Sequence, residues 1–201
     1  MTADSPTLVV LAGPNGAGKS TVAPSVLKGA LDVTEFVNAD VIALGLSGFD
    51  PASAAIPAGR IMLKRARELA RAREDFALET TLANRAFAPW IRSLIDDGYR
   101  FHLVFMWLSS ADLAVGRVAE RVRLGGHDVP EQTIRRRYVS GLENFFSLYR
   151  PMASSWRFYD NSGEGQARLI AAGHGNETAT CNDTDLWQRI VREHQHANSK
   201  Q

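Results

Sequence analysis

The sequence is organised around the stretch Thr7-Leu-Val-Val-Leu-Ala-Gly-Pro-Asn-Gly-Ala-Gly-Lys-Ser-Thr21. Residues 7–12 are short, apolar and rich in β-branched side chains, which predicts a strand buried on both faces. Residues 13–20 then match the pattern G-x-x-x-x-G-K-[ST] at every position. This pattern indicates a phosphate-binding loop when a strand precedes it and a helix follows it. The stretch therefore predicts a domain that binds a nucleoside triphosphate.

The residue types of the motif each suit phosphate binding. Gly16 and Gly18 allow a tight turn whose backbone N–H groups point at phosphate oxygens, and the helix that follows adds its positive end. Lys19 can reach the β- and γ-phosphates, and the Ser20 hydroxyl can ligate Mg²⁺. The residues expected to bind the nucleotide are Gly13, Pro14, Asn15, Gly16, Ala17, Gly18, Lys19, Ser20 and Thr21.

Composition limits the class of protein. A length of 201 residues predicts a single domain over residues 1–201, and no repeat or interdomain linker is visible. A net charge of +1 provides no overall attraction to nucleic acid or to a membrane, so we expect neither as a partner. Cys181 is the single cysteine, so no intrachain disulfide forms and a passive thiol is expected. No apolar stretch approaches about 18 residues, which favours a cytoplasmic protein.

Strand and helix patterns alternate along the chain. This alternation predicts an α/β fold of the P-loop, nucleotide-kinase type, with a parallel five-stranded sheet and helices on both faces. A small hairpin within residues 166–180 and a closing helix over residues 184–196 form a C-terminal extension, at about residues 163–201. The strands are expected at residues 7–12, 34–37, 76–79, 101–108 and 156–159, and the main helices at residues 21–28, 51–74, 80–97, 112–123 and 131–150.

Two acidic residues follow predicted strands. Asp40 comes after the second strand and Glu79 ends the third, so both lie at the sheet edge where ligands bind in such folds. Asp40 could accept the proton of an attacking hydroxyl or hold a magnesium-bound water, and the alternative is a helix cap. Glu79 could bind the acceptor or stand behind the metal, and the alternative is a structural partner for an arginine.

A basic helix–loop–helix is predicted at about residues 117–137. Its six arginines against three acidic residues give a local charge of +3 in a nearly neutral chain, and Gly125-Gly126 is a plausible hinge. We interpret it as a mobile, arginine-rich lid that reaches the β- and γ-phosphates, with a solvated basic face as the alternative. His127 is expected to be a loop residue. The arginines are Arg117, Arg121, Arg123, Arg135, Arg136 and Arg137.

With these residues in place, roughly residues 7–162 resemble the zeta-toxin family of P-loop kinases. The resemblance rests on the P-loop together with Asn38-Ala-Asp40, Glu79-Thr-Thr81, Gly125-Gly-His-Asp-Val-Pro130 with Arg135-Arg-Arg-Tyr138, and Tyr159-Asp-Asn-Ser162. It implies ATP and Mg²⁺ as cofactors and phosphorylation of the 3′-hydroxyl of the amino sugar in UDP-N-acetylglucosamine. It also implies a possible antitoxin protein as partner. The best-known toxins are longer than this chain, so the kinase expectation is firmer than the substrate.

The resemblance also implies roles for single residues. Lys19 is implied as the P-loop lysine and Asp40 as the catalytic base. Arg123 and Arg136 are favoured as the catalytic lid arginines, while Arg121 is expected at the nucleotide. Asp40, Glu79, Thr80 and Thr81 are expected to bind the acceptor.

Other functions stay open on the same motif. A kinase for an antibiotic, another sugar or a nucleotide would need the same loop, and so would a non-kinase ATP-binding switch. A polynucleotide kinase is less favoured, because the basic residues gather in one lid and form no stripe with interleaved aromatic side chains. A transport-type ATPase is also less favoured, because such proteins use an apolar strand that ends in an acidic pair. Here Leu108 is followed by Ser109, and no predicted strand ends in such a pair.

Overall fold

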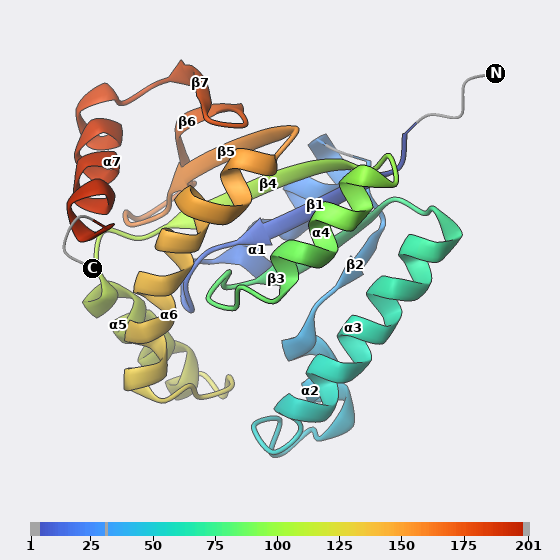
Figure 1. The fold of residues 1–201 in the computed structure, drawn as a ribbon. Helices are drawn as coiled ribbons and strands as arrows, with labels where there is room; N and C mark the ends of the chain where they lie inside the picture. The colour runs from blue at the N-terminus through green and yellow to red at the C-terminus, as the bar shows by residue number, and fades with distance from the viewer. Residues whose placement is uncertain (1–4, 31, 199–201) are drawn as a thin grey trace.

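The computed structural model describes residues 5–30 and 32–198. Within these residues one seven-stranded sheet runs through the molecule, with helices on both faces (Figure 1). The spatial order of its strands is β2 (Glu35–Val37), β3 (Phe76–Thr80), β1 (Thr7–Ala12), β4 (Arg100–Trp107), β5 (Ser155–Asp160), β6 (Arg168–His174) and β7 (Glu177–Cys181).

The first five of these strands are parallel, as the alternation of strands and helices predicts. The last two are not: β6 runs antiparallel to β5, and β7 runs antiparallel to β6. The expectation of a five-stranded, wholly parallel sheet is therefore wrong in number and in direction. The predicted hairpin exists, but it pairs with the β5 edge, which the helices leave open for backbone hydrogen bonding.

The helices connect the strands and cover both sheet faces. They are α1 (Lys19–Pro24), continued by a π-helical segment η1 (Ser25–Ala30), then α2 (Ala39–Leu46), α3 (Ala55–Ala72), α4 (Phe87–Asp96), α5 (Ala111–Arg123), α6 (Glu131–Asn144), the π-helical η2 (Phe145–Tyr149), the 3₁₀ turn η3 (Arg150–Met152) and α7 (Thr184–Asn198). In the described part of the chain no helix combines the length and the hydropathy that crossing a membrane would require.

Strand β1 is the centre of the fold because its six residues are all buried between two apolar layers. One layer joins the sheet to α3, α4, η2 and α7, and the other joins it to α1 and α5. The first layer contains stacked aromatic rings, such as Phe105 on Phe158 with ring centroids 5.3 Å apart. These layers hold the carboxyl ends of the parallel strands at one edge, where the P-loop lies.

Two helices next to the site differ from expectation. The helix expected from Thr80 begins only at Phe87, because the Thr80 hydroxyl accepts a hydrogen bond from the Leu82 N–H and Leu82 has a positive φ of 57°. Helix α2 follows β2, where a helix was considered only in the alternative role of Asp40, and Asn38 caps it by accepting hydrogen bonds from the N–H groups of Asp40 and Val41. Asp40 lies in the first turn, so the view of Asp40 as the helix cap is wrong.

Candidate active site

The P-loop leaves β1 at the carboxyl edge of the sheet and enters α1 at Lys19. Gly13 has φ 137°, and a side chain there would meet the Met106 carbonyl oxygen at 2.2 Å. Gly16 has φ 76°, and a side chain there would meet the Ala114 carbonyl oxygen at 2.9 Å. Only glycine suits both positions, because the backbone is left-handed and the neighbouring carbonyls leave no room for a Cβ atom. The loop therefore has the tight form that the motif predicts.

Lys19 points back over this loop and is 7% exposed. Its Nζ atom donates a hydrogen bond to the Pro14 carbonyl at 3.0 Å and lies 3.7 Å from Glu79 Oε1. Burial lowers the pKa of Lys19, while the nearby carboxylates of Glu79 and Asp40 oppose this shift. The Lys19 ammonium group thus has one carbonyl and one carboxylate as partners, and a phosphate group would offer it more negative charge.

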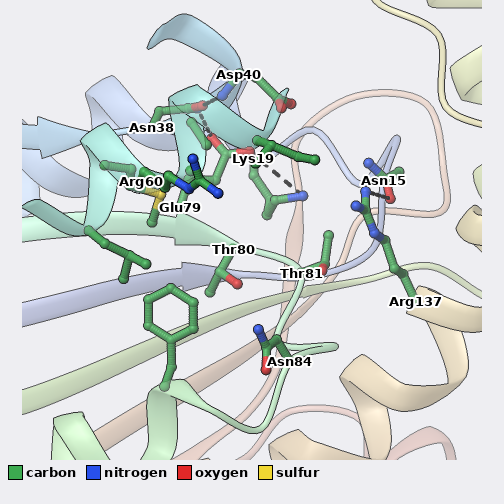
Figure 2. A pocket seen from close by; sticks show the side chains of 16 residues that line it. Asn15, Lys19, Asn38, Asp40, Arg60, Glu79, Thr80, Thr81, Asn84 and Arg137 are labelled. Atoms are coloured by element: carbon green, nitrogen blue, oxygen red, sulfur yellow. Dashed lines mark hydrogen bonds and ion pairs between the residues drawn. The ribbon is translucent and has the colours of Figure 1, made fainter. Parts of the chain in front are cut away.

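Glu79 joins three segments that lie far apart in the sequence. Its Oε2 atom accepts a hydrogen bond from Asn38 Nδ2 at 2.7 Å (Figure 2). The same atom accepts a hydrogen bond from the Ser20 hydroxyl at 2.8 Å, and the side chain is 10% exposed. The alternative that Glu79 pairs with an arginine finds no support, since its cationic partner is Lys19. Glu79 therefore aligns the loop lysine, the expected metal ligand and the cap of α2.

These side chains border a cavity of about 370 Å³ at the edge of the sheet (Figure 2). The volume lies at the lower end of the range typical of small-molecule sites. Its walls combine the P-loop, the start of α2, one side of α3, the segment after β3 and one residue of α6. The polar residues that line it are Asn15, Lys19, Asn38, Asp40, Arg60, Glu79, Thr80, Thr81, Asn84 and Arg137.

The expected acceptor-side residues all lie in this cavity. Asp40, Glu79, Thr80 and Thr81 line the same wall region as Lys19. Asp40 also borders a second cavity of about 450 Å³, which it shares with Ser20 and Arg121. The structure therefore places Asp40 beside both Lys19 and Ser20, the expected metal ligand, in two neighbouring cavities.

The arginines of α5 and α6 divide into two groups. Arg137 reaches the first cavity, with Nη1 3.4 Å from Asn15 Oδ1, and burial lowers its pKa. Arg121 donates a hydrogen bond to the His127 carbonyl at 2.6 Å and faces the second cavity. Arg123 is 75% exposed and pairs with Glu120, and Arg136 is exposed. Arg137 and Arg121 thus line the first and second cavities, and the two arginines favoured from the sequence lie outside them.

Asn161, at the end of β5, braces the loop from the other side. Its Nδ2 atom donates to the Ala17 carbonyl at 3.0 Å, and its own carbonyl accepts from Arg117 at 2.7 Å. Next to it lies a third cavity of about 600 Å³, bordered by Gly18, Thr21 and Tyr159. Sequence reasoning included Asn161 in a motif but assigned it no role, although its place directly after a parallel strand was the available signal.

Arg117 and Arg135 have local partners. Arg117 donates to the carbonyl groups of residues 161–163, and Arg135 pairs with Asp112 and Glu131. Arg117 therefore joins α5 to the segment after β5, where it also borders the third cavity, and Arg135 joins α5 to α6. The mobility of the predicted lid stays a prediction.

The sheet, the glycine-rich loop and the buried lysine define a P-loop nucleotide-binding domain. Residues 8–138 match the model of the AAA_33 family, described as an AAA domain, and the chain belongs to this family.

Known proteins resemble this chain in sequence or in fold, at low sequence identity. An uncharacterized protein of Haemophilus influenzae is 27% identical over 126 residues, which are 63% of this chain and 88% of that protein. A chain of the AvrRxo1-ORF1:-ORF2 complex solved with ATP has a TM-score of 0.72 and 17% identity over 92% of this chain, which spans 63% of that one. A chain from the PezAT toxin–antitoxin system of Streptococcus pneumoniae has a TM-score of 0.64 and 14% identity, covering 98% of this chain and 86% of that one.

Proposed function

We propose that this protein is an ATP-dependent kinase that transfers the γ-phosphate to a hydroxyl group of a small molecule. The observation that carries the proposal is that Lys19 and Asp40 line the same cavity of about 370 Å³. A nucleotide-binding switch needs the lysine but has no need of an open, carboxylate-bearing cavity beside it. A kinase needs both, because an acceptor must be placed in line with the phosphate that is transferred.

The nucleotide would occupy the P-loop from the side of α1. The backbone N–H groups of residues 13–18 and the Lys19 ammonium would bind its phosphates. The cavity beside Asn161, at the opposite side of the loop from Asp40, suits the nucleoside, since Gly18 and Thr21 border it. This arrangement leaves the terminal phosphate pointing toward the first cavity.

The oxygen donors near the loop fit Mg²⁺. Ser20 bears a hydroxyl that is already hydrogen-bonded to a buried carboxylate, and Asp40 borders the same space. Mg²⁺ commonly takes only one or two protein ligands and completes its shell with water and phosphate oxygens. Ser20 would hold the ion, with Glu79 and Asp40 behind bound waters, and the ion would neutralise phosphate charge.

Asp40 is assigned as the general base for the acceptor hydroxyl. Its carboxylate lies on a helix that Asn38 caps, so its placement does not depend on any hydrogen bond of its own side chain. Arg121 and Arg137 are assigned to the transferring phosphate in place of Arg123 and Arg136. Both cations lie close enough to Lys19 to lower its pKa.

A sugar nucleotide such as UDP-N-acetylglucosamine is proposed as the acceptor on the resemblance to the zeta-toxin family. The similarity of the whole described fold to a chain of the PezAT toxin–antitoxin system supports this proposal and an antitoxin partner. A kinase for another hydroxyl compound would use the same Lys19, Asp40 and Arg137.

The test is a screen for ADP release with ATP and Mg²⁺ against a panel of sugar nucleotides, sugars and nucleosides. A kinase consumes ATP faster in the presence of its acceptor, and the acceptor gains one phosphate. If the rate of ATP consumption is the same with every member of the panel, the protein is a switch or a hydrolase.

A further inference from the structure

Arg60 on α3 is assigned no part in nucleotide binding, yet this exposed residue lines the first cavity. Figure 2 shows its side chain extending from α3 into that cavity, on the side away from Arg137 and Asn15. No hydrogen bond or ion pair joins it to another residue in the ranges that the structure describes. Arg65, on the same helix, pairs with Glu35 at 2.9 Å. Arg60 thus presents an unpaired guanidinium to the space beside Asp40.

The charges of the cavity wall leave Arg60 uncompensated. Lys19 lies 3.7 Å from Glu79, so the charges of these two largely offset each other. The Asp40 carboxylate raises the pKa of Arg137 against the effect of burial, so these two groups also interact. Both carboxylates of the cavity therefore already act on other cations, and Arg60 is left as the cation that meets the acceptor.

We propose that the acceptor carries an anionic group besides its reactive hydroxyl, and that Arg60 binds that group. The inference rests on the proposed kinase activity. A guanidinium binds carboxylate and phosphate oxygens through two parallel, charge-assisted N–H···O bonds, which fixes orientation as well as charge. Thr80, Thr81 and Asn84 on another wall offer hydroxyl and amide groups for the neutral part of the molecule.

Binding, measured separately from turnover, tests the inference. The protein, saturated with a non-hydrolysable ATP analogue and Mg²⁺, is titrated by calorimetry with neutral sugars, sugar acids, sugar phosphates and nucleotide sugars. We expect detectable binding only among the anionic compounds. The sugar acids and the phosphorylated compounds separate a carboxylate from a phosphate as the group that Arg60 binds.

Variants then assign the binding to Arg60. Arg60→Ala should weaken binding of the anionic ligand roughly 10- to 100-fold, the usual effect of losing a hydrogen bond to a charged group. The affinity of Arg60→Lys for the anionic ligand should lie between those of the wild type and Arg60→Ala, because lysine keeps the charge but lacks the planar fork. Arg67→Ala removes another exposed arginine of α3 and should leave ligand affinity unchanged. The affinity for the ATP analogue should be the same in all four proteins.

The two proposals fail in different ways. A neutral compound that binds best, or an anionic ligand whose affinity is the same in Arg60→Ala and wild type, overturns the role of Arg60 while leaving the kinase intact. Anionic ligands that bind through Arg60 but never gain phosphate would instead support the site and overturn the kinase.

Discussion

At the scale of single residues, the role of Asp40 is what distinguishes a kinase from a nucleotide-binding switch. It lies in the first turn of α2, and it borders the first and second cavities. Because Asn38 provides the helix cap, the Asp40 carboxylate is not needed to hold the helix. Its effect on chemistry can therefore be measured without a large effect on folding.

We expect Asp40→Asn to bind ATP and Mg²⁺ nearly as the wild type does. Acceptor phosphorylation should fall by roughly 10² to 10⁴, the contribution of a positioned base, because the amide cannot take a proton. ATP affinity, phosphorylation rate and melting temperature are measured on the same preparation. Phosphorylation within a few-fold of wild type would remove Asp40 from the mechanism, and a parallel loss of magnesium-dependent ATP affinity would place it at the metal.

The neighbouring pair Arg136 and Arg137 provides a second comparison. Arg137→Ala should lower turnover by about 10² or more, because it removes a cation aimed at the transferring phosphate. Arg136→Ala should leave turnover within a few-fold, since that side chain is exposed and lines no part of the cavity. Single-turnover phosphorylation at saturating ATP measures both. A larger loss in Arg136→Ala would reverse the assignment.

The choice among the lid arginines illustrates what the sequence could and could not predict about the site. The positions of the P-loop, Asp40 and Glu79 were predictable because each lies at or just after the carboxyl end of a strand, and these ends meet at one edge. Three consecutive arginines point in three directions around a helix, about 100° apart, so spacing alone does not select one. Arg137 is selected by the crossing of α6 over the P-loop, which brings it to Asn15 across 122 positions of sequence.

At the scale of elements, β5 supports the P-loop through Asn161. Asn161→Ala removes its hydrogen bond to the Ala17 carbonyl and should cost about 1 kcal/mol of stability. It should also weaken ATP binding, because the P-loop is no longer held by this hydrogen bond. The control is Asn182→Ala, which removes a comparable bond to the Leu169 carbonyl in the hairpin. Urea unfolding should show similar losses in both variants, and only Asn161→Ala should change the ATP dissociation constant.

The C-terminal extension is predicted to be an integral part of the fold. Trp187 on α7 is buried and stacks on Trp156 of β5, with ring centroids 5.4 Å apart. Trp187→Ala should lower the free energy of unfolding by about 3–5 kcal/mol, as for other buried aromatic residues. Arg189→Ala on the exposed side of α7 should change it by less than about 0.5 kcal/mol. Equal effects in urea unfolding would mean that α7 contributes little to the core.

The pairing of the hairpin with β5 and the late start of α4 were not predicted, and both have a common physical reason. The hairpin of β6 and β7 follows from local turn residues, but its pairing with β5 depends on which sheet edge stays open. Tertiary contacts decide this pairing, because Gly173 lies against Trp156 and the Glu177 backbone with no room for a side chain. The late start of α4 likewise follows from side-chain hydrogen bonds of Thr80 and Asn84, which compete with helix formation.

At the scale of the whole molecule, the P-loop lies between two cavities. The third cavity, proposed for the nucleoside, is bordered by α1 and the end of β5, and the first cavity, proposed for the acceptor, by α2, α3 and α6. The parallel part of the sheet positions both, because strands β1, β3 and β5 end at one edge. Phosphate would therefore pass from one side of Lys19 to the other.

Transfer of label from ATP marked at its γ-phosphate tests this account most directly. With Mg²⁺ and the acceptor found by screening, the label should appear on a hydroxyl of the acceptor, with one ADP released for each phosphate transferred. Lys19→Ala should slow the transfer by about 10² or more, since it removes charge from the β- and γ-phosphates. Label that leaves only as inorganic phosphate, or transfer by Lys19→Ala at the wild-type rate, would contradict the account.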